Sequence, residues 1–410
     1  MDTDNVERME SQNQHSQSPP VGTTFLRTCF NGVNTLSGVG ILSVAYALSK
    51  GGWLSLLLLF LVALICFYTG LLLRRCMDSN PRIKTYPDIG EAAFGRKGSL
   101  VISTFLYLEL FLVACGFLIM GGDNLHKLYP KKSFDIFGMN IGGIQVYVVL
   151  TALVILPTTW LTNLGILAYV SAGGVMATLI LIVAVFWAGA FDGIGFHEKG
   201  ELLNWNGLPI AISLFTFCYC GHAVFPTLSD SMEDKSQFKK VLSVCFIVST
   251  ISYGSMAIFG YLMFGKHMAS QVTLDLPAKN ISSKIAIYTT LMVPITKYAL
   301  IIAPVALSLE ETFPFRKSKM MSCLIRTCIV ISTVFVALLV PYFAHVLSLI
   351  GAFSGITLSI LFPCLCYWKI TIGFKRFRKE TMGILMILLI GTSVAIVGTY
   401  KALTNIIKEI

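Results

Sequence analysis

The stretch from Phe30 to Ala47, FNGVNTLSGVGILSVAYA, constrains the fold of this chain more than any other part of the sequence. It is apolar enough to enter a lipid bilayer, yet glycines and polar residues stand in its middle. Each glycine costs a helix interior roughly 1 kcal/mol relative to alanine, and polar side chains in hydrocarbon cost more. The composition therefore predicts a membrane helix that is broken at its centre. Lipid cannot satisfy the freed backbone groups, so the break has to face protein or a water-filled cavity.

Composition places the whole chain in the membrane. Charged residues make up 13% of the 410 residues, about half of their usual share of ~25% in soluble proteins. The apolar runs are about 20 residues long, enough for a helix to cross the hydrocarbon core. We therefore predict an all-α polytopic membrane protein with eleven transmembrane helices, near residues 24–49, 53–73, 99–122, 142–160, 164–190, 207–230, 238–263, 284–309, 322–341, 344–368 and 381–402.

The segments between the spans complete the predicted organisation. Residues 1–22 are polar and predict a disordered cytoplasmic tail without a signal peptide. Residues 86–94, YPDIGEAAF, predict a short helix at the membrane interface. The first five spans occupy residues 23–190, the second five residues 191–370, and a basic loop with the eleventh helix residues 371–410.

Charge sets the predicted orientation. The net charge is +10, and most of the 31 Lys and Arg residues lie in the segments that share one side of the membrane with the N-terminus. This excess puts the N-terminus in the cytoplasm and the C-terminus in the lumen or outside. Short basic blocks between apolar runs indicate contact with the lipid bilayer and not with nucleic acid. The sequon at Asn280 falls in a non-cytoplasmic loop of this topology.

The residues that usually carry enzyme chemistry do not form a recognisable site. The 11 cysteines fall in apolar segments or on the cytoplasmic side and lack metal-site spacing, so we interpret them as packing residues. The 6 histidines form no cluster with acids, and no phosphate-binding glycine loop precedes a lysine. We therefore expect neither an enzyme nor a bound metal or cofactor, and no obligatory protein partner is evident.

A second span carries the same kind of interruption as the first. The span at residues 207–230 contains Gly221 and His222 at mid-depth and Pro226 four residues later. Five spans separate the starts of the two interrupted helices, so the second unit enters from the opposite face. This offset predicts an inverted five-plus-five repeat with a binding site where the broken helices meet. The alternative is two unrelated kinked helices, since Gly and Pro are common in membrane spans.

Several motifs resemble the amino acid/auxin permease superfamily, and within it the plant and fungal vacuolar amino acid transporters. They are TLSGVGILSVAYAL with GGW, GDNLHKLYP, TWLTNLGILAYVSAGG, FCYCGHAVFPTLSDSMEDKSQFKKVL, ITKYAL and FPCLCYWKI. The resemblance implies a leucine-transporter-type fold with discontinuous helices 1 and 6, and secondary transport of amino acids that is usually coupled to protons. Two positions depart from it: Ala45 stands where the family usually has Pro, and Gly121 where many relatives carry an acid.

An amino acid substrate presents a carboxylate and an ammonium on one carbon. The start of the second half of span one offers free N–H groups and a positive dipole end for the carboxylate. The end of the first half of span six offers unpaired carbonyls for the ammonium. The candidate substrate-binding residues are Asn34, Ser37, Gly38, Val39, Gly40, Ile41, Phe217, Tyr219, Cys220 and Gly221.

Three ionisable residues lie near mid-span and are candidates for proton coupling: Lys297, His222 and Glu109. A charge at the bilayer centre costs at least about 2.5 kcal/mol, so each should have a partner. In the implied fold span eight packs against span one where related carriers hold Na⁺, so Lys297 could replace a coupling sodium by binding the freed carbonyls of span one. The alternatives are a static Lys297–Glu109 ion pair and a His222 that only plugs the helix break.

These features favour a proton-coupled secondary transporter of neutral amino acids that works by alternating access. The proton gradient then supplies the energy, although Na⁺ is not excluded. The other candidates are a sodium-coupled carrier and a membrane receptor that senses an amino acid without moving it. Resemblance alone places the protein in the vacuolar membrane, with the plasma membrane as the alternative.

Overall fold

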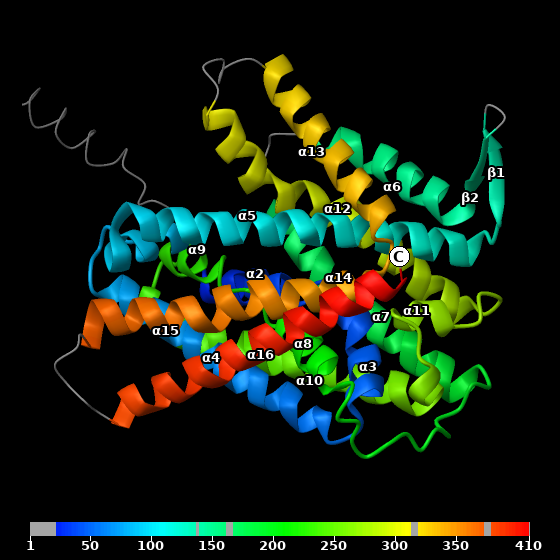
Figure 1. Ribbon diagram of the computed structural model, residues 1–410, viewed down its shortest axis with the longest axis horizontal. Helices are drawn as coiled ribbons and strands as arrows, with labels where there is room; N and C mark the ends of the chain where they lie inside the picture. Colours follow the sequence, from blue (N-terminus) through cyan, green and yellow to red (C-terminus); the bar gives the residue numbers. More distant parts are fainter. Residues whose placement is uncertain (1–21, 137–138, 161–166, 313–318, 373–378, 410) are drawn as a thin grey trace, which may run out of the picture.

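The computed structural model describes residues 22–136, 139–160, 167–312, 319–372 and 379–409, so almost all of the predicted tail lies outside the described residues. The described chain is a helical bundle in which α5 extends along most of the molecule (Figure 1). Its long helices are α4 (Ser55–Asp78), α5 (Tyr86–Leu128), α6 (Gly143–Thr159), α7 (Leu167–Phe191), α10 (Phe238–Phe264), α12 (Ile281–Thr312), α13 (Lys319–Leu339) and α16 (Lys379–Glu409).

The helices coincide with the eleven apolar segments of the sequence. Within the described residues, eight helices are long and apolar enough to cross a membrane, and one bent pair makes a ninth. Two further apolar helices, α6 and the shorter α8 (Leu208–Cys218), lie at the fourth and sixth predicted spans. The chain is therefore a polytopic helical membrane protein.

The first predicted break is confirmed. The helix α2 (Phe25–Leu36) stops, and α3 (Gly40–Gly51) starts after three intervening residues with a bend of 51° between the two helices. The helix α3 then runs without interruption through Ala45, so the position where the resemblance implies a proline lies inside a continuous helix in this chain.

The second predicted interruption is also present. The helix α8 ends at Cys218, and the chain becomes helical again only in α9 (Phe225–Asp230), so Gly221 and His222 lie in the connection. Pro226 stands in the first turn of α9, where backbone N–H groups make no hydrogen bond within the helix, so the lack of an N–H in proline costs nothing there. It therefore starts a helix and does not kink one.

The tenth predicted span is a composite helix. It consists of α14 (Phe343–Ile350), α15 (Phe362–Tyr367) and three π-helical turns at Gly351–Gly355, Thr357–Leu361 and Trp368–Ile372. Such π-helical turns widen a helix locally and are frequent at functional sites.

The short helix predicted at residues 86–94 forms the start of α5. Thr85 caps it, because the Thr85 side chain accepts a hydrogen bond from the Asp88 N–H while the Asp88 carboxylate accepts one from the Thr85 N–H. At Gly95 the backbone turns with φ 69°, a conformation that favours glycine, and the chain then continues as the membrane helix.

One element was not predicted. The strands β1 (Ser133–Ile136) and β2 (Met139–Gly142) form an antiparallel hairpin between α5 and α6, with Ser133 opposite Gly142. Each strand has only 4 residues, too few for an alternating pattern to stand out. The hairpin is the exception to the all-α prediction within the described residues.

The core of the bundle is built around α3. Eleven of the twelve residues of α3 are buried, and α3 packs against α8 and α10. Large apolar side chains are instead exposed on outer helices, among them Val183, Phe335 and Leu389. This distribution suits a protein whose outer surface faces lipid and whose broken helices lie inside.

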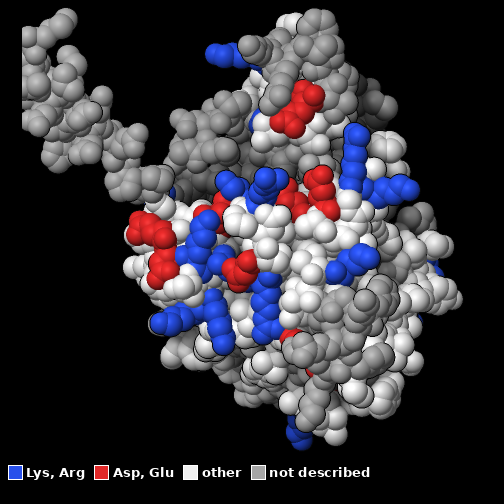
Figure 2. Space-filling model, turned by 90° about the vertical axis from the view of Figure 1, so that its left-hand side faces the viewer, with Lys and Arg blue, Asp and Glu red and all other residues white. Residues whose placement is uncertain are grey.

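Charged side chains gather at one end of the molecule. Figure 2 shows Lys and Arg side chains interspersed with acids on the end at the left of Figure 1. Ion pairs between Arg75 and Glu380 (2.5 Å) and between Arg74 and Asp78 (2.7 Å) hold the end of α4.

Candidate functional site

The two helix breaks lie side by side and share one hydrogen-bonding residue. Tyr253 on α10 directs its hydroxyl at the carbonyl oxygens of Leu36, at the end of α2, and Cys218, at the end of α8; the second distance is 3.0 Å. Tyr253 is fully buried at 1% exposure. The hydroxyl therefore partners carbonyl groups that the helix ends leave without an intrahelical donor.

Close packing at Gly40 brings the breaks together. A Cβ atom on Gly40 would lie 2.9 Å from the Cys218 sulfur and 3.2 Å from the Cys218 Cα. The start of α3 can therefore contact the end of α8 only because residue 40 has no side chain. Gly38 differs, since a Cβ atom there would meet nothing within 4 Å.

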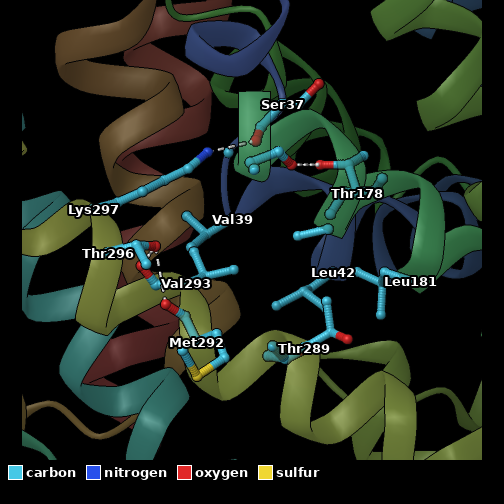
Figure 3. Close-up of a pocket in the computed structure, with 16 residues that line it drawn as sticks. Ser37, Val39, Leu42, Thr178, Leu181, Thr289, Met292, Val293, Thr296 and Lys297 are labelled. Carbon is cyan, nitrogen blue, oxygen red and sulfur yellow. Dashed lines mark hydrogen bonds between the residues drawn. The ribbon is translucent and has the colours of Figure 1, made fainter. Parts of the chain in front are cut away.

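The open space beside Gly38 is a cavity of about 200 Å³. It lies between the α2–α3 break, α7 and α12, and Figure 3 shows Lys297 at one end and Leu42, Leu181 and Thr289 at the other. The lining mixes apolar groups with hydroxyls and one charged group. It consists of Ser37, Gly38, Val39, Ile41, Leu42, Gly173, Gly174, Ala177, Thr178, Leu181, Thr289, Thr290, Met292, Val293, Thr296 and Lys297.

Lys297 occupies the break itself. Its ammonium donates to the carbonyl oxygens of Asn34 (3.2 Å) and Ser37 (2.9 Å), which the end of α2 leaves free. The side chain is 9% exposed. This is the contact that the sequence analysis proposed for Lys297.

The backbone on the other side of the break offers donors. In the described part of the chain no backbone acceptor is found for the N–H groups of Val39 and Gly40. These groups belong to the first turn of α3, where the helix dipole also favours negative charge. Val39 lines the cavity next to Lys297.

The other two ionisable candidates lie elsewhere. Glu109 on α5 does not line the cavity, and its Oε2 atom is buried without a hydrogen-bond partner. Nothing in the described residues joins Glu109 to Lys297, whose ammonium contacts only carbonyls. The static ion pair between the two is therefore absent from this structure.

His222 fills the second break. Its Nε2 atom lies 3.0 Å from the carbonyl oxygen of Cys66 and 3.0 Å from the Thr69 hydroxyl. The carbonyl can only accept, so Nε2 carries the proton and donates. Nδ1 is buried and has no partner among the described residues. This is the arrangement of a neutral ring that bridges the break to α4.

The candidates on span six do not line this cavity. Tyr219 is fully buried, donates to the Thr250 hydroxyl at 2.9 Å and stacks on Phe246. Phe217 is 8% exposed and belongs to the same apolar core. A Cβ atom on Gly221 would lie 2.9 Å from Leu36, so Gly221 is a second point of close packing.

Asn34 and Gly40 lie next to the cavity but do not line it, and Cys220 lies apart from it. Asn34 directs its side chain at Gly174 on α7, where a Cβ atom would lie 1.9 Å from the amide oxygen. The Cys220 thiol donates to the Thr216 carbonyl oxygen at 3.3 Å and packs against Gly355. The cavity therefore contains Ser37, Gly38, Val39 and Ile41, and Gly40 supports it from behind.

Several residues of the site were missed by the sequence analysis. Tyr253 and Thr290 come from helices that carry no unusual motif at these positions. Gly173 and Gly174 of α7 end one of the family motifs, but the sequence analysis did not assign them to the site. Thr290 is 1% exposed, lines the cavity and has a hydroxyl without a hydrogen-bond partner. The only sign of Thr290 in the sequence is a polar residue in an apolar span. Many such residues hydrogen-bond a carbonyl of their own helix and belong to no site.

A polytopic helical protein with a cavity at a broken membrane helix, lined by apolar groups, hydroxyls and one lysine, has the form of a solute carrier. Comparison with known proteins gives the family. The family described as "Transmembrane amino acid transporter protein" matches residues 21–404, and the chain belongs to it.

Named relatives agree with this assignment. The chain is 50% identical over 405 residues to the amino acid transporter AVT1I of Arabidopsis thaliana, which covers 98% of this chain and 100% of the relative. It is 46% identical to AVT1J of the same plant, over 95% of this chain and 93% of the relative. It is also 26% identical to the vesicular GABA transporter of Caenorhabditis elegans, over 100% of this chain and 85% of the relative. The family and these relatives are transporters and not enzymes.

Proposed function

We propose that this protein is a proton-coupled secondary active transporter of neutral amino acids that works by alternating access. The observation that carries the proposal is the Lys297 ammonium on the freed carbonyls of Asn34 and Ser37, beside the cavity at the α2–α3 break. A cation that can lose its proton takes the place that a coupling sodium ion would otherwise need. The named relatives support amino acids as the transported class.

In this proposal the eleven helical segments are eleven spans. Residues 23–190 and 191–370 form two inverted five-helix repeats of the leucine-transporter type, and residues 371–410 add the eleventh helix. The matching interruptions at α2–α3 and α8–α9 support the repeat. The site lies between the repeats at mid-membrane.

The proposed roles follow the chemistry of each group. The free N–H groups at Val39 and Gly40 bind the substrate carboxylate, and Ser37, Gly38 and Ile41 form the wall beside it. The carbonyls at Phe217 to Cys220 bind the substrate ammonium when the two halves of the carrier rearrange. A cavity of about 200 Å³ is small for a ligand site, because pockets for drug-sized ligands hold ~300–1,000 Å³. It therefore suits small amino acids.

The proposed placement is the vacuolar membrane, with the N-terminus in the cytoplasm and the C-terminus in the lumen. The excess of Lys and Arg in the loops predicted to be cytoplasmic supports the orientation. The resemblance to vacuolar transporters supports the compartment.

Uptake by purified protein in liposomes tests the function. We expect a neutral amino acid to accumulate against its concentration gradient when a pH gradient is imposed, and a protonophore to abolish this accumulation. A sodium gradient is imposed separately at constant pH. Accumulation that follows only the sodium gradient would make the protein a sodium-coupled carrier.

A sensing receptor is the second candidate, and the same liposomes separate it from a carrier. A receptor binds the amino acid but accumulates none under either gradient. Liposomes that contain the Lys297→Met variant provide the mechanistic control, since we expect its uptake to lose the response to pH. Unchanged pH dependence in Lys297→Met would remove the lysine from the coupling mechanism.

A further inference from the structure

The Lys297 ammonium has an incomplete set of partners. An ammonium carries three N–H donors, and two of them are used on the Asn34 and Ser37 carbonyls. Within the described chain no carboxylate pairs with Lys297. A buried cation is costly unless it is paired with an anion or fully hydrogen-bonded. The remaining donor is therefore available to a ligand in the cavity.

The cavity wall is suited to an anion. Among the described residues that line it there is no Asp or Glu, and Lys297 is the one titratable group. The Thr290 hydroxyl, 1% exposed and without a partner, is available from the wall of the same space. The Thr178 and Thr296 hydroxyls already donate to carbonyls of their own helices, at 3.0 Å and 2.9 Å, so they offer only lone pairs.

We propose that the substrate carboxylate and the coupling proton bind as one unit at Lys297. The protonated amine donates to the carboxylate, which also accepts hydrogen bonds from the Thr290 hydroxyl and from the free N–H groups of Val39 and Gly40. This inference rests on the proposed transport function and deepens it, because it puts the coupling in a single ion pair. It also specifies the substrates, which must have a carboxylate and no net positive charge.

The coupling follows from reciprocal binding. A bound carboxylate favours the protonated amine, and by linkage the bound proton favours the carboxylate to the same extent. When the carboxylate leaves, the ammonium keeps only two carbonyl partners in a desolvated site. The N–H bond then breaks, its electron pair stays on nitrogen as a lone pair, and the proton passes to water from the compartment that the site faces.

Other titratable groups do not account for this behaviour. The helices packed around α12 and the break carry several of them, but in the described chain none lines the cavity or bonds to the Lys297 amine. They include Cys29 on α2, Tyr46 on α3, Glu109 and Asp123 on α5, Tyr147 on α6, Tyr253 on α10 and Arg326 on α13. Among residues 173–191 of α7 there is no titratable side chain.

Equilibrium binding at several pH values tests the inference without any gradient. Purified full-length protein is titrated with glycine, alanine and serine, and with alaninamide, which lacks the carboxylate. The pH is kept where the charges of these ligands do not change. For the wild type we expect the Kd of the amino acids to rise with pH by up to about tenfold per unit, as one linked proton requires. Alaninamide should show no such slope.

Variants of the lysine separate charge from structure. Arginine stays protonated at any accessible pH, so Lys297→Arg should bind amino acids with a Kd that no longer depends on pH. Lys297→Met should bind weakly at every pH. Lys284→Arg, an exposed lysine on the same helix, is the matched control and should keep the wild-type slope.

The outcomes are distinct from those of the transport assay. A wild-type slope in Lys297→Arg, or an equal slope for alaninamide, would overturn the inference while leaving amino acid transport possible through another proton site. Failure to bind any neutral amino acid would instead contradict the proposed function itself. Size-exclusion profiles of each variant show whether it is folded.

Discussion

At the scale of single residues, Gly38 and Gly40 meet opposite environments. Gly40 is in contact with Cys218, so that a methyl group at residue 40 would collide with α8, whereas Gly38 faces the cavity and has open space around it. One glycine is required by packing and the other borders the site. The same residue type therefore has two separate physical effects.

Alanine substitutions distinguish the two glycines. Gly40→Ala should lower the free energy of unfolding by about 1–3 kcal/mol, the usual cost of overpacking, and thermal denaturation of the purified protein measures it. Gly38→Ala should leave stability nearly unchanged but raise the Kd for the substrate, because its methyl group enters the cavity. Gly254→Ala, which also meets open space but lies away from the cavity, is the control. Equal effects of Gly38→Ala and Gly254→Ala on Kd would contradict the assignment.

His222 permits a second residue-scale prediction. A glutamine can donate to the Cys66 carbonyl as the Nε2–H group does, so His222→Gln should transport with an unchanged response to a pH gradient. His222→Ala leaves that carbonyl without its donor and should lose about 1–3 kcal/mol of stability. Uptake into liposomes and thermal denaturation are the two measurements. A His222→Gln protein that no longer responds to pH would show that the imidazole carries a proton.

At the scale of elements, α10 holds the two broken helices together. It packs on α2 and α3, and its Tyr253 hydroxyl meets the carbonyls at the ends of α2 and α8. Tyr253→Phe should reduce stability by about 1–3 kcal/mol because buried carbonyls lose a donor. It should also weaken substrate binding, since the geometry of the break is no longer fixed.

A second buried tyrosine is the control for this prediction. Tyr298 on α12 bonds the Thr333 hydroxyl at 2.6 Å, away from the breaks. Tyr298→Phe should lower thermal stability by a similar amount and leave the substrate Kd unchanged. If both variants change the Kd equally, Tyr253 has no special role at the break.

The predictable part of the fold is the part that local composition controls. Glycines and polar residues in apolar runs predict the α2–α3 and α8–α9 interruptions, and span length predicts the helices. The interruptions and the helices depend on energies that a short stretch of sequence already contains. A charge at mid-depth predicts only that Lys297 needs a partner; that this partner is the break was predicted from the helix neighbours that the family resemblance implies.

The rest depends on which helix faces meet. The sequence placed Phe217 to Gly221 opposite Gly38, but the cavity opens on the other side of the break, between α7 and α12. Tyr253 and Thr290 lie beside the α2–α3 break although they are more than 200 positions further along the chain. Nothing in their local sequence specifies these neighbours.

At the scale of the whole molecule, charge distribution predicts the orientation. The connection between α4 and α5 is basic, and its Lys84 is exposed. Lys279, two residues before α12, is exposed on the predicted opposite side. A membrane-impermeant maleimide applied from the cytoplasmic side of intact vacuoles should label Lys84→Cys and not Lys279→Cys.

Two controls complete the orientation test. Permeabilised vacuoles should allow labelling of both introduced cysteines, and the unsubstituted protein shows the background from Cys328, which is exposed. Labelling of Lys279→Cys alone in intact vacuoles would reverse the proposed topology.

The packing of α5 on α6 has a consequence for the family. A Cβ atom on Gly121 would lie 2.5 Å from a methyl group of Thr151, so the acid that the family resemblance implies at this position has no room here. An acid at residue 121 would need a smaller residue at position 151 or a wider separation of the two helices. Residues 121 and 151 should therefore change together in evolution. A Gly121→Glu substitution alone should push α5 away from α6.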